Sequence, residues 1–93
     1  MNSISTPLVS VMIPYYNCKD YIAETIESIE AQTYSTIEII VVNDGSQEAD
    51  TLYLQQLLQS KPHIVLVSQT NKGLPSARNS AAKAAHGKYY LFV

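Results

Sequence analysis

The sequence is poor in cysteine, glycine and charge, and each shortage excludes a class of protein. The single cysteine, Cys18, cannot form an internal disulfide, which fits a reducing compartment. The three glycines form neither a Gly-x-Gly-x-x-Gly motif nor a Gly-rich Lys-Ser/Thr loop, so dinucleotide-binding and P-loop folds lack support. Charged residues are only 15% of the chain and the net charge is −2, which argues against nucleic acid as a partner. The sequence shows neither a leader pattern nor a long apolar run, so we expect a soluble, cytoplasmic protein.

What is present is an ordinary folded composition, with 46% apolar residues in 93. This length suits one small domain with a modest core and excludes a second domain. Short β-branched runs alternate with stretches that repeat apolar residues at helical spacing, which predicts a three-layer α/β/α fold of order β-α-β-α-β-α-β with a parallel sheet buried on both faces. We expect strands at Val9–Ile13, Ile37–Val42, Ile64–Val67 and Tyr89–Val93, and helices at Asp20–Gln32, Ala49–Ser60 and from about Gly73 to Gly87.

Local signals set the ends of these helices. Asp20 is the expected N-cap of the first helix, because its side chain can accept a hydrogen bond from a free N–H of the first turn. Pro62 ends the second helix, since proline lacks an N–H. Pro75 suits the first turn of the third helix, and Gly87 suits a left-handed C-cap.

The last predicted strand, Tyr89–Val93, is apolar and aromatic and no turn residue follows it. We therefore interpret residues 1–93 as a single truncated subdomain. We also expect the open edge of this strand to favour self-association.

Right-handed crossovers bring the three strand-to-helix joints to the carboxyl edge of the sheet, where open α/β sheets bind ligands. Asp44 ends a buried strand there, just before Gly45. Its carboxylate can accept hydrogen bonds from a base or ribose, or it can organise the turn and cap the next helix.

Arg78 is unusual because it is a cation in the first turns of the third helix, where the dipole disfavours positive charge. Its spacing from Ala81, Ala82 and Ala85 places it on the face expected to pack on the sheet. Such a guanidinium needs an anion, either Asp44 in an internal salt bridge or a phosphate or nucleotide group.

Tyr15 and Tyr16 follow Pro14 and offer rings on which a nucleobase can stack, with Asn17 beside them as donor and acceptor. We expect one of the two tyrosines to pack against the fold, and the pattern does not say which. The segment Asn71-Lys72-Gly73 is able to approach a phosphate. His63 and His86 are too far apart in the sequence to suggest a metal site.

Three motifs together resemble the opening of family 2 glycosyltransferases of the GT-A fold. They are Val9-Ser10-Val11-Met12-Ile13-Pro14-Tyr15-Tyr16-Asn17, Glu38-Ile39-Ile40-Val41-Val42-Asn43-Asp44-Gly45-Ser46 and Asn71-Lys72-Gly73-Leu74-Pro75-Ser76-Ala77-Arg78-Asn79. The pairs Tyr21-Ile22, Ser28-Ile29 and Gln32-Thr33, and Gly87-Lys88-Tyr89, add to the likeness, which spans nearly the whole chain.

The resemblance implies that the chain binds the nucleotide of a nucleotide-sugar donor, commonly a UDP-sugar. It implies that Pro14 and Tyr16 flank or stack on the base, that Asp44 hydrogen-bonds the base, and that Arg78 lies against the nucleotide; Tyr15 is also expected among the nucleotide-binding residues. Asn17 and Ser46 take supporting roles. Asp44, Arg78 and a tyrosine are then expected to converge on one open rim.

The resemblance also implies features that these residues do not supply. In the family an Asp-x-Asp motif, which would follow Val93, holds a divalent metal, Mn²⁺ or Mg²⁺, and a later residue acts as the catalytic base. We therefore expect no catalytic residue, no metal ligand and no transfer activity in this chain alone. The full-length parent is expected to be an inverting glycosyltransferase of cell-wall or polysaccharide biosynthesis, at the inner membrane surface or in the cytoplasm.

Two rival interpretations stay open. In a noncatalytic α/β interaction module, Asp44 and Arg78 pair with each other and the tyrosines only pack. A nucleotidyltransferase is less favoured, because such enzymes carry a Gly-rich basic signature where this chain has Pro14-Tyr15-Tyr16-Asn17.

Overall fold

The computed structural model describes residues 7–32 and 36–93 and has the predicted order of alternating strands and helices. Thr33, part of one motif noted above, lies outside these residues. The elements are β1 (Val9–Tyr15), α1 (Lys19–Glu30), β2 (Ile37–Asp44), α2 (Glu48–Gln59), β3 (Val65–Gln69), α3 (Leu74–Ala84) and β4 (Tyr89–Phe92).

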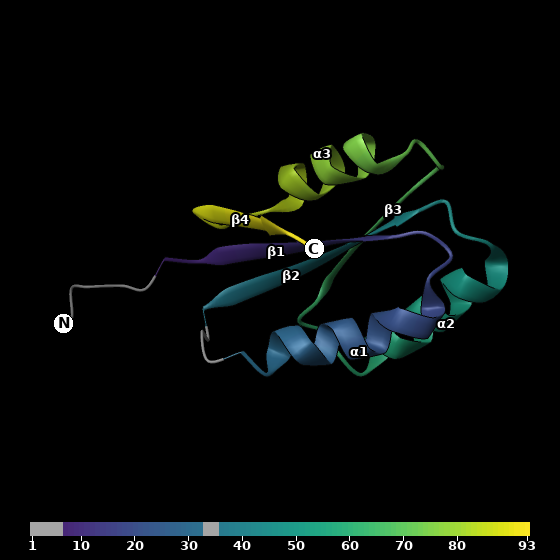
Figure 1. The fold of residues 1–93 in the computed structure, drawn as a ribbon, viewed down its shortest axis with the longest axis horizontal. Coiled ribbons are helices and arrows are strands. Elements are labelled where there is room, and N and C mark those ends of the chain that lie inside the picture. The colour runs from purple at the N-terminus through teal and green to yellow at the C-terminus, as the bar shows by residue number, and fades with distance from the viewer. Residues whose placement is uncertain (1–6, 33–35) are drawn as a thin grey trace.

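The four strands form one parallel sheet in the order β3-β2-β1-β4. Helices α1 and α2 cover one face and α3 covers the other, so the molecule has three layers (Figure 1). The chain moves outward from β1 to β3 and then returns to place β4 on the other side of β1. The loops after β1 and β3 therefore leave the sheet towards opposite layers, and they leave an opening between them at the carboxyl edge.

Alternation along β1 and β2 produces a separate core on each face of the sheet. The core under α1 and α2 is large and aliphatic, whereas the core under α3 is made with alanines. The first core contains Ile13, Tyr15, Ile22, Ile26, Ile39, Val41, Leu54, Leu58 and Ile64, and the second contains Met12, Ile40, Val42, Ala77 and Ala81.

The prediction that the strands are buried on both faces is confirmed for the central strands β1 and β2 and is wrong for the outer strands β3 and β4. All of β4 is exposed, and the side chains from Tyr89 to Val93 are 42–55% accessible. In β3, Val65 and Ser68 are also exposed. Each outer strand has a neighbour on one side only, and α3 contacts mainly β1 and β2.

Three of the four strands extend further than the apolar runs predicted at their carboxyl ends. β1 continues to Tyr15, β2 to Asp44 and β3 to Gln69, because the ladder pairs Tyr15 with Asn43 and Asp44 with Gln69. Backbone pairing does not require apolar side chains. This extension brings polar residues onto the rigid end of the sheet.

Two predicted helix caps are wrong. The N-cap of α1 is Cys18, whose side chain makes no capping bond, and Asp20 lies inside the first turn. Helix α3 ends at Ala84, and Gly87 does not have a positive φ. Gly87 is instead required by close packing, since a Cβ there would lie 2.5 Å from Ser10 Oγ.

The amino edge of the sheet is held by polar contacts that involve both histidines. Glu38 accepts hydrogen bonds from the backbone N–H of His86 at 2.9 Å and from Ser10 Oγ at 3.2 Å. Burial alone would raise the pKa of Glu38, but these bonds and the His86 ring outweigh it and lower the pKa. His63 and Lys61 pair with Glu30 at the end of α1. Both histidines therefore have structural partners.

Candidate nucleotide site

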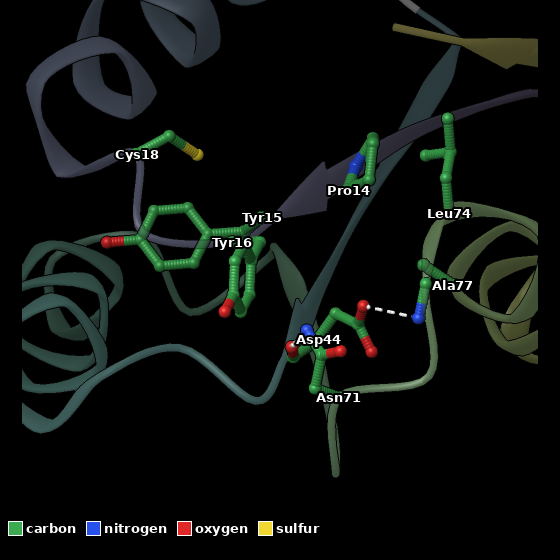
Figure 2. A pocket seen from close by; sticks show the side chains of 9 residues that line it. Pro14, Tyr15, Tyr16, Cys18, Asp44, Asn71, Leu74 and Ala77 are labelled. Atoms are coloured by element: carbon green, nitrogen blue, oxygen red, sulfur yellow. Dashed lines mark hydrogen bonds between the residues drawn. The ribbon is translucent and has the colours of Figure 1, made fainter.

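The loops after β1, β2 and β3 meet around a hollow of about 360 Å³ at the carboxyl edge (Figure 2). The residues that follow β1 form one wall, the start of α3 forms the other, and Asp44 at the end of β2 lies between them. The lining residues are Pro14, Tyr15, Tyr16, Cys18, Asp44, Asn71, Gly73, Leu74 and Ala77. This is the edge at which the sequence placed a ligand.

Asp44 is 5% accessible, and its carboxylate accepts three hydrogen bonds, one from the last residue of β3 and two from the loop that follows β3. Oδ1 accepts from Gln69 Nε2 at 2.8 Å and from the backbone N–H of Lys72 at 2.9 Å, and Oδ2 accepts from the backbone N–H of Gly73 at 3.0 Å. The Gln69 bond, followed by the Lys72 and Gly73 bonds, holds the pKa of Asp44 below its ordinary value. The carboxylate is therefore ionised at neutral pH.

A carboxylate has about four acceptor positions, two on each oxygen. Three of those on Asp44 are filled by Gln69, Lys72 and Gly73. One acceptor position, on Oδ2, remains for a group in the hollow. Within the described part of the chain, the carboxylate neither bonds to its own turn nor caps α2, whose N-cap is Gln47; it holds the loop after β3 and still has one free acceptor.

The turn after β2 is pressed against the loop after β3. Gly45 has a φ of 70°, and a Cβ on it would lie 2.5 Å from the backbone nitrogen of Asn71. Asn71 Nδ2 donates to the backbone oxygen of Asp44 at 3.1 Å. Glycine is needed here for its backbone conformation and for the close approach of the two chains.

The two tyrosines have different environments. Tyr15 is fully buried, and its hydroxyl donates to the backbone oxygen of Asp50 at 2.7 Å. Tyr16 is 53% accessible and lines the hollow. Figure 2 shows the Tyr15 ring directed towards α1 and α2, away from Asp44. Tyr15 is therefore the tyrosine that packs, and Tyr16 is the one with a free ring face.

We expect Tyr15→Phe to lower the free energy of unfolding by about 1 kcal/mol, because the buried hydrogen bond to Asp50 is lost. Burial, and then the nearby Asp50 carboxylate, raises the pKa of Tyr15 from 10.0 to about 12. The protonated phenol therefore stabilises the fold fully below pH 10, and this contribution disappears as the pH rises towards 12. Urea unfolding between pH 8 and 12 should show a loss of wild-type stability that Tyr15→Phe lacks. Equal pH dependence of the two proteins would contradict this assignment.

Asn17 and Ser46 connect the loops after β1 and β2 and do not line the hollow. The backbone N–H of Asn17 donates to Ser46 Oγ at 3.0 Å, and Asn17 Oδ1 accepts from the backbone N–H of Gln47 at 2.7 Å. Asn17 has a φ of 50°, a conformation that asparagine tolerates better than most residues. Their contacts are those of supporting residues.

The expectation that Arg78 is buried against the sheet is wrong. Arg78 is exposed, lies outside the lining of the hollow, and its guanidinium is 5.4 Å from the centre of the Phe92 ring on β4. The buried stripe of α3 is Ala77 and Ala81, and Arg78 is one residue, about 100°, further round the helix. Asp44 and Tyr16 therefore converge on the rim without Arg78. Among the described residues Arg78 forms no ion pair, so the salt bridge to Asp44 is also absent.

All three residues of the loop Asn71-Lys72-Gly73 donate hydrogen bonds to Asp44. The sequence did not indicate this contact. The backbone N–H groups of Lys72 and Gly73 are used by the carboxylate and are not free to bind a phosphate. Sequence reasoning also missed Gln69, which contacts Asp44, and Cys18, Leu74 and Ala77, which line the hollow. For Gln69, the sequence offered one indication of a role at the site, namely a polar residue at the end of an apolar strand.

Across residues 7–32 and 36–93 no three His, Cys, Asp or Glu side chains come together in a way that would hold a metal ion. The described residues of this chain therefore do not fit a divalent metal. In the same parts of the chain, no helix has the length and apolarity needed to cross a bilayer.

A parallel α/β sheet with a hollow at its carboxyl edge, between loops that leave on opposite faces, is the arrangement in which open α/β proteins bind ligands. The sequence model of glycosyl transferase family 2 matches residues 10–93, and the chain belongs to this family. The fold is the N-terminal portion of the GT-A glycosyltransferase fold.

Individual relatives agree with this assignment. The uncharacterized glycosyltransferase EpsJ of Bacillus subtilis is 44% identical over 87 residues, which are 94% of this chain and 25% of EpsJ. The structure of S. aureus TarS 1–349 with UDP-GlcNAc has a TM-score of 0.78 and 35% identity, covering 91% of this chain and 25% of TarS 1–349. The mannosyltransferase PcManGT of Pyrobaculum calidifontis, with GDP-Man and Mn²⁺, has a TM-score of 0.77 and 25% identity, covering 92% and 26%. The chain thus spans about a quarter of the length of these relatives.

Proposed function

We propose that this chain is the base-recognition half-site of a glycosyltransferase that takes a UDP-sugar and transfers the sugar, with inversion, to an acceptor hydroxyl. The observation that carries the proposal is the ionised Asp44 carboxylate, which has one free acceptor position beside the exposed ring of Tyr16. TarS, solved with UDP-GlcNAc, shares the fold and is 35% identical to this chain.

The number of free acceptors favours uracil. The pairing edge of uracil carries one N–H donor between two carbonyl oxygens, so it needs one acceptor from the protein. Guanine presents two adjacent donors on its pairing edge and needs two acceptors. Asp44 has one position left, on Oδ2, because Gln69, Lys72 and Gly73 fill the other three.

The remaining roles follow from exposure and contacts. Tyr16 offers an exposed ring on which the base stacks, Pro14 and the edge of Tyr15 bound the hollow, and Asn17 and Ser46 hold the two loops in register. Arg78 has an exposed guanidinium with no ion pair among the described residues, so it is available to an anionic group of the nucleotide.

The metal and the catalytic base belong to the longer protein in this proposal. PcManGT was solved with Mn²⁺, and a divalent metal in the parent would neutralise the diphosphate leaving group. An Asp-x-Asp motif beyond Val93 is the proposed ligand set. The chain alone is accordingly proposed to bind weakly and to catalyse nothing.

We expect UDP to shift the backbone amide signals of Tyr16, Gly45 and Gly73 in NMR titrations, with a Kd on the order of 1 mM that Mn²⁺ does not improve. Tyr16→Ala should weaken binding about tenfold, since base stacking on an aromatic ring contributes about 1–3 kcal/mol. The matched control is Tyr21→Ala, which removes another exposed tyrosine, on α1 and outside the hollow. Shifts elsewhere, an equal effect of the two variants, or tight Mn²⁺-dependent binding in calorimetry would defeat the proposal.

A further inference from the structure

Gln69 is the last residue of β3 and lies opposite Asp44 in the ladder between β2 and β3. Its amide nitrogen donates to Asp44 Oδ1 at 2.8 Å. No sequence motif singled it out. Asp44 is the carboxylate proposed to bind the base. The orientation of the Gln69 amide therefore affects which hydrogen bonds Asp44 can still accept from a base.

Asp44 and two serines of helix α3 surround the Gln69 amide. Ser80 Oγ donates to the amide oxygen of Gln69, and Ser76 Oγ lies 3.5 Å from the amide nitrogen. A flipped amide would direct its oxygen at the ionised Asp44 carboxylate, which can only accept hydrogen bonds. The Asp44 carboxylate therefore commits the NH₂ group of Gln69 to itself, and Ser80 supports this orientation by donating to the amide oxygen on the other side.

This bond occupies the acceptor position on Oδ1 that Lys72 leaves open. Without it, each oxygen of Asp44 would have one free position, and the carboxylate could accept two parallel hydrogen bonds. Two parallel donors are what the pairing edge of guanine presents. With Gln69 in place, only the single donor of a uracil-type imide finds a match.

We propose that Gln69 is a positioning residue that sets the base preference of the site, because it leaves Asp44 one acceptor and so favours uracil over guanine. This inference rests on the proposed function. Gln69 acts through Asp44 and does not itself contact the base. The lowered pKa of Asp44, whose largest cause is the Gln69 bond, agrees with this role.

The test compares Gln69→Met, Gln69→Glu and the wild-type chain by NMR, with UDP and GDP as ligands and with a pH titration of the Asp44 carboxyl carbon. Gln69→Met keeps the length of the side chain and removes the donor. We expect it to raise the pKa of Asp44 and to strengthen GDP binding relative to UDP binding, so that the ratio of UDP to GDP affinity falls about tenfold. Amide spectra establish that each variant is folded.

Gln69→Glu adds a signature that a purely structural role would not show. At neutral pH the introduced carboxylate repels Asp44, and UDP binding should be lost. At acidic pH its protonated form donates to Asp44 in place of the amide, and UDP binding should recover. The matched control, Gln56→Glu, places the same charge on the exposed surface of α2 and should leave the affinities for UDP and GDP unchanged.

The outcomes separate this inference from the proposed function. If the wild-type chain prefers UDP and Gln69→Met keeps that preference with an unchanged Asp44 titration, the inference on Gln69 is overturned and the proposed function stands. If the wild-type chain binds neither nucleotide, or prefers GDP, both are overturned.

Discussion

Gly45→Ala is expected to lower the free energy of unfolding by about 2–4 kcal/mol, as an alanine at this φ of 70° is strained and its Cβ would lie 2.5 Å from the nitrogen of Asn71. The Asn71 atom is backbone, so it cannot rotate away as a long side chain would. The loop after β3 must move, and the hydrogen bonds that it makes to Asp44 move with it. In a chain of this size a loss of this order lowers the melting temperature by about 10 °C or more, which calorimetry would measure.

Gly73→Ala is the matched control, because Gly73 also has a positive φ, 90°, but a Cβ there would meet only Pro75 Cδ at 3.9 Å. Its backbone, at φ 90° and ψ 170°, also disfavours a side chain, but no atom collides with the added Cβ, so its loss should be about 1–2 kcal/mol. If both variants lose the same free energy of unfolding, the close approach of Asn71 to Gly45 has no energetic consequence and the prediction for Gly45→Ala is wrong.

Asp44→Asn should abolish detectable UDP binding, since it removes the charge and replaces one acceptor oxygen by an NH₂ group. The retained oxygen is expected to face Gln69 and Lys72, which supply two of the three donors. The amide nitrogen then points at the position where uracil presents its own N–H. Donor faces donor, and binding should fall by about a hundredfold. Cytosine has an acceptor nitrogen at the same place, so the variant should bind CDP better than UDP.

NMR titration with UDP and CDP measures this reversal. Asp20→Asn is the control for charge, because Asp20 is an exposed acid on α1 away from the hollow. It should leave both affinities unchanged. An Asp44→Asn variant that still binds UDP as the wild type does would remove Asp44 from base recognition.

The fold class and the order of elements were predictable because the apolar runs and the helical repeats are separate in the sequence. The ends of the elements were less so. Strand β2 continues through Asn43 and Asp44 because backbone pairing with β1 and β3 holds them, and no apolar pattern reports such pairing. Cys18 begins α1 without a side-chain bond, so no capping pattern marks it.

The site was predictable where it depended on chain direction alone. Asp44 and Tyr16 end or follow parallel strands, which places them at one edge whatever the sheet order. The position of Arg78 depended on the rotation of α3 about its axis, and a stripe of small alanines fixes that rotation too weakly in sequence. Gln69 was missed because its pairing with Asp44 follows from the order β3-β2, which the sequence does not contain.

The thin alanine contact between α3 and the sheet has a consequence for how this protein can evolve. Ala77 and Ala81 are almost fully buried, and Ala77 also lines the hollow. A larger side chain at either position would lift α3 from the sheet and carry Leu74 and Gln69's partner Ser80 outward with it. The width of the opening therefore depends on the small side chains of Ala77 and Ala81, and a substitution at either position would change the shape of the hollow without changing Asp44 or Tyr16.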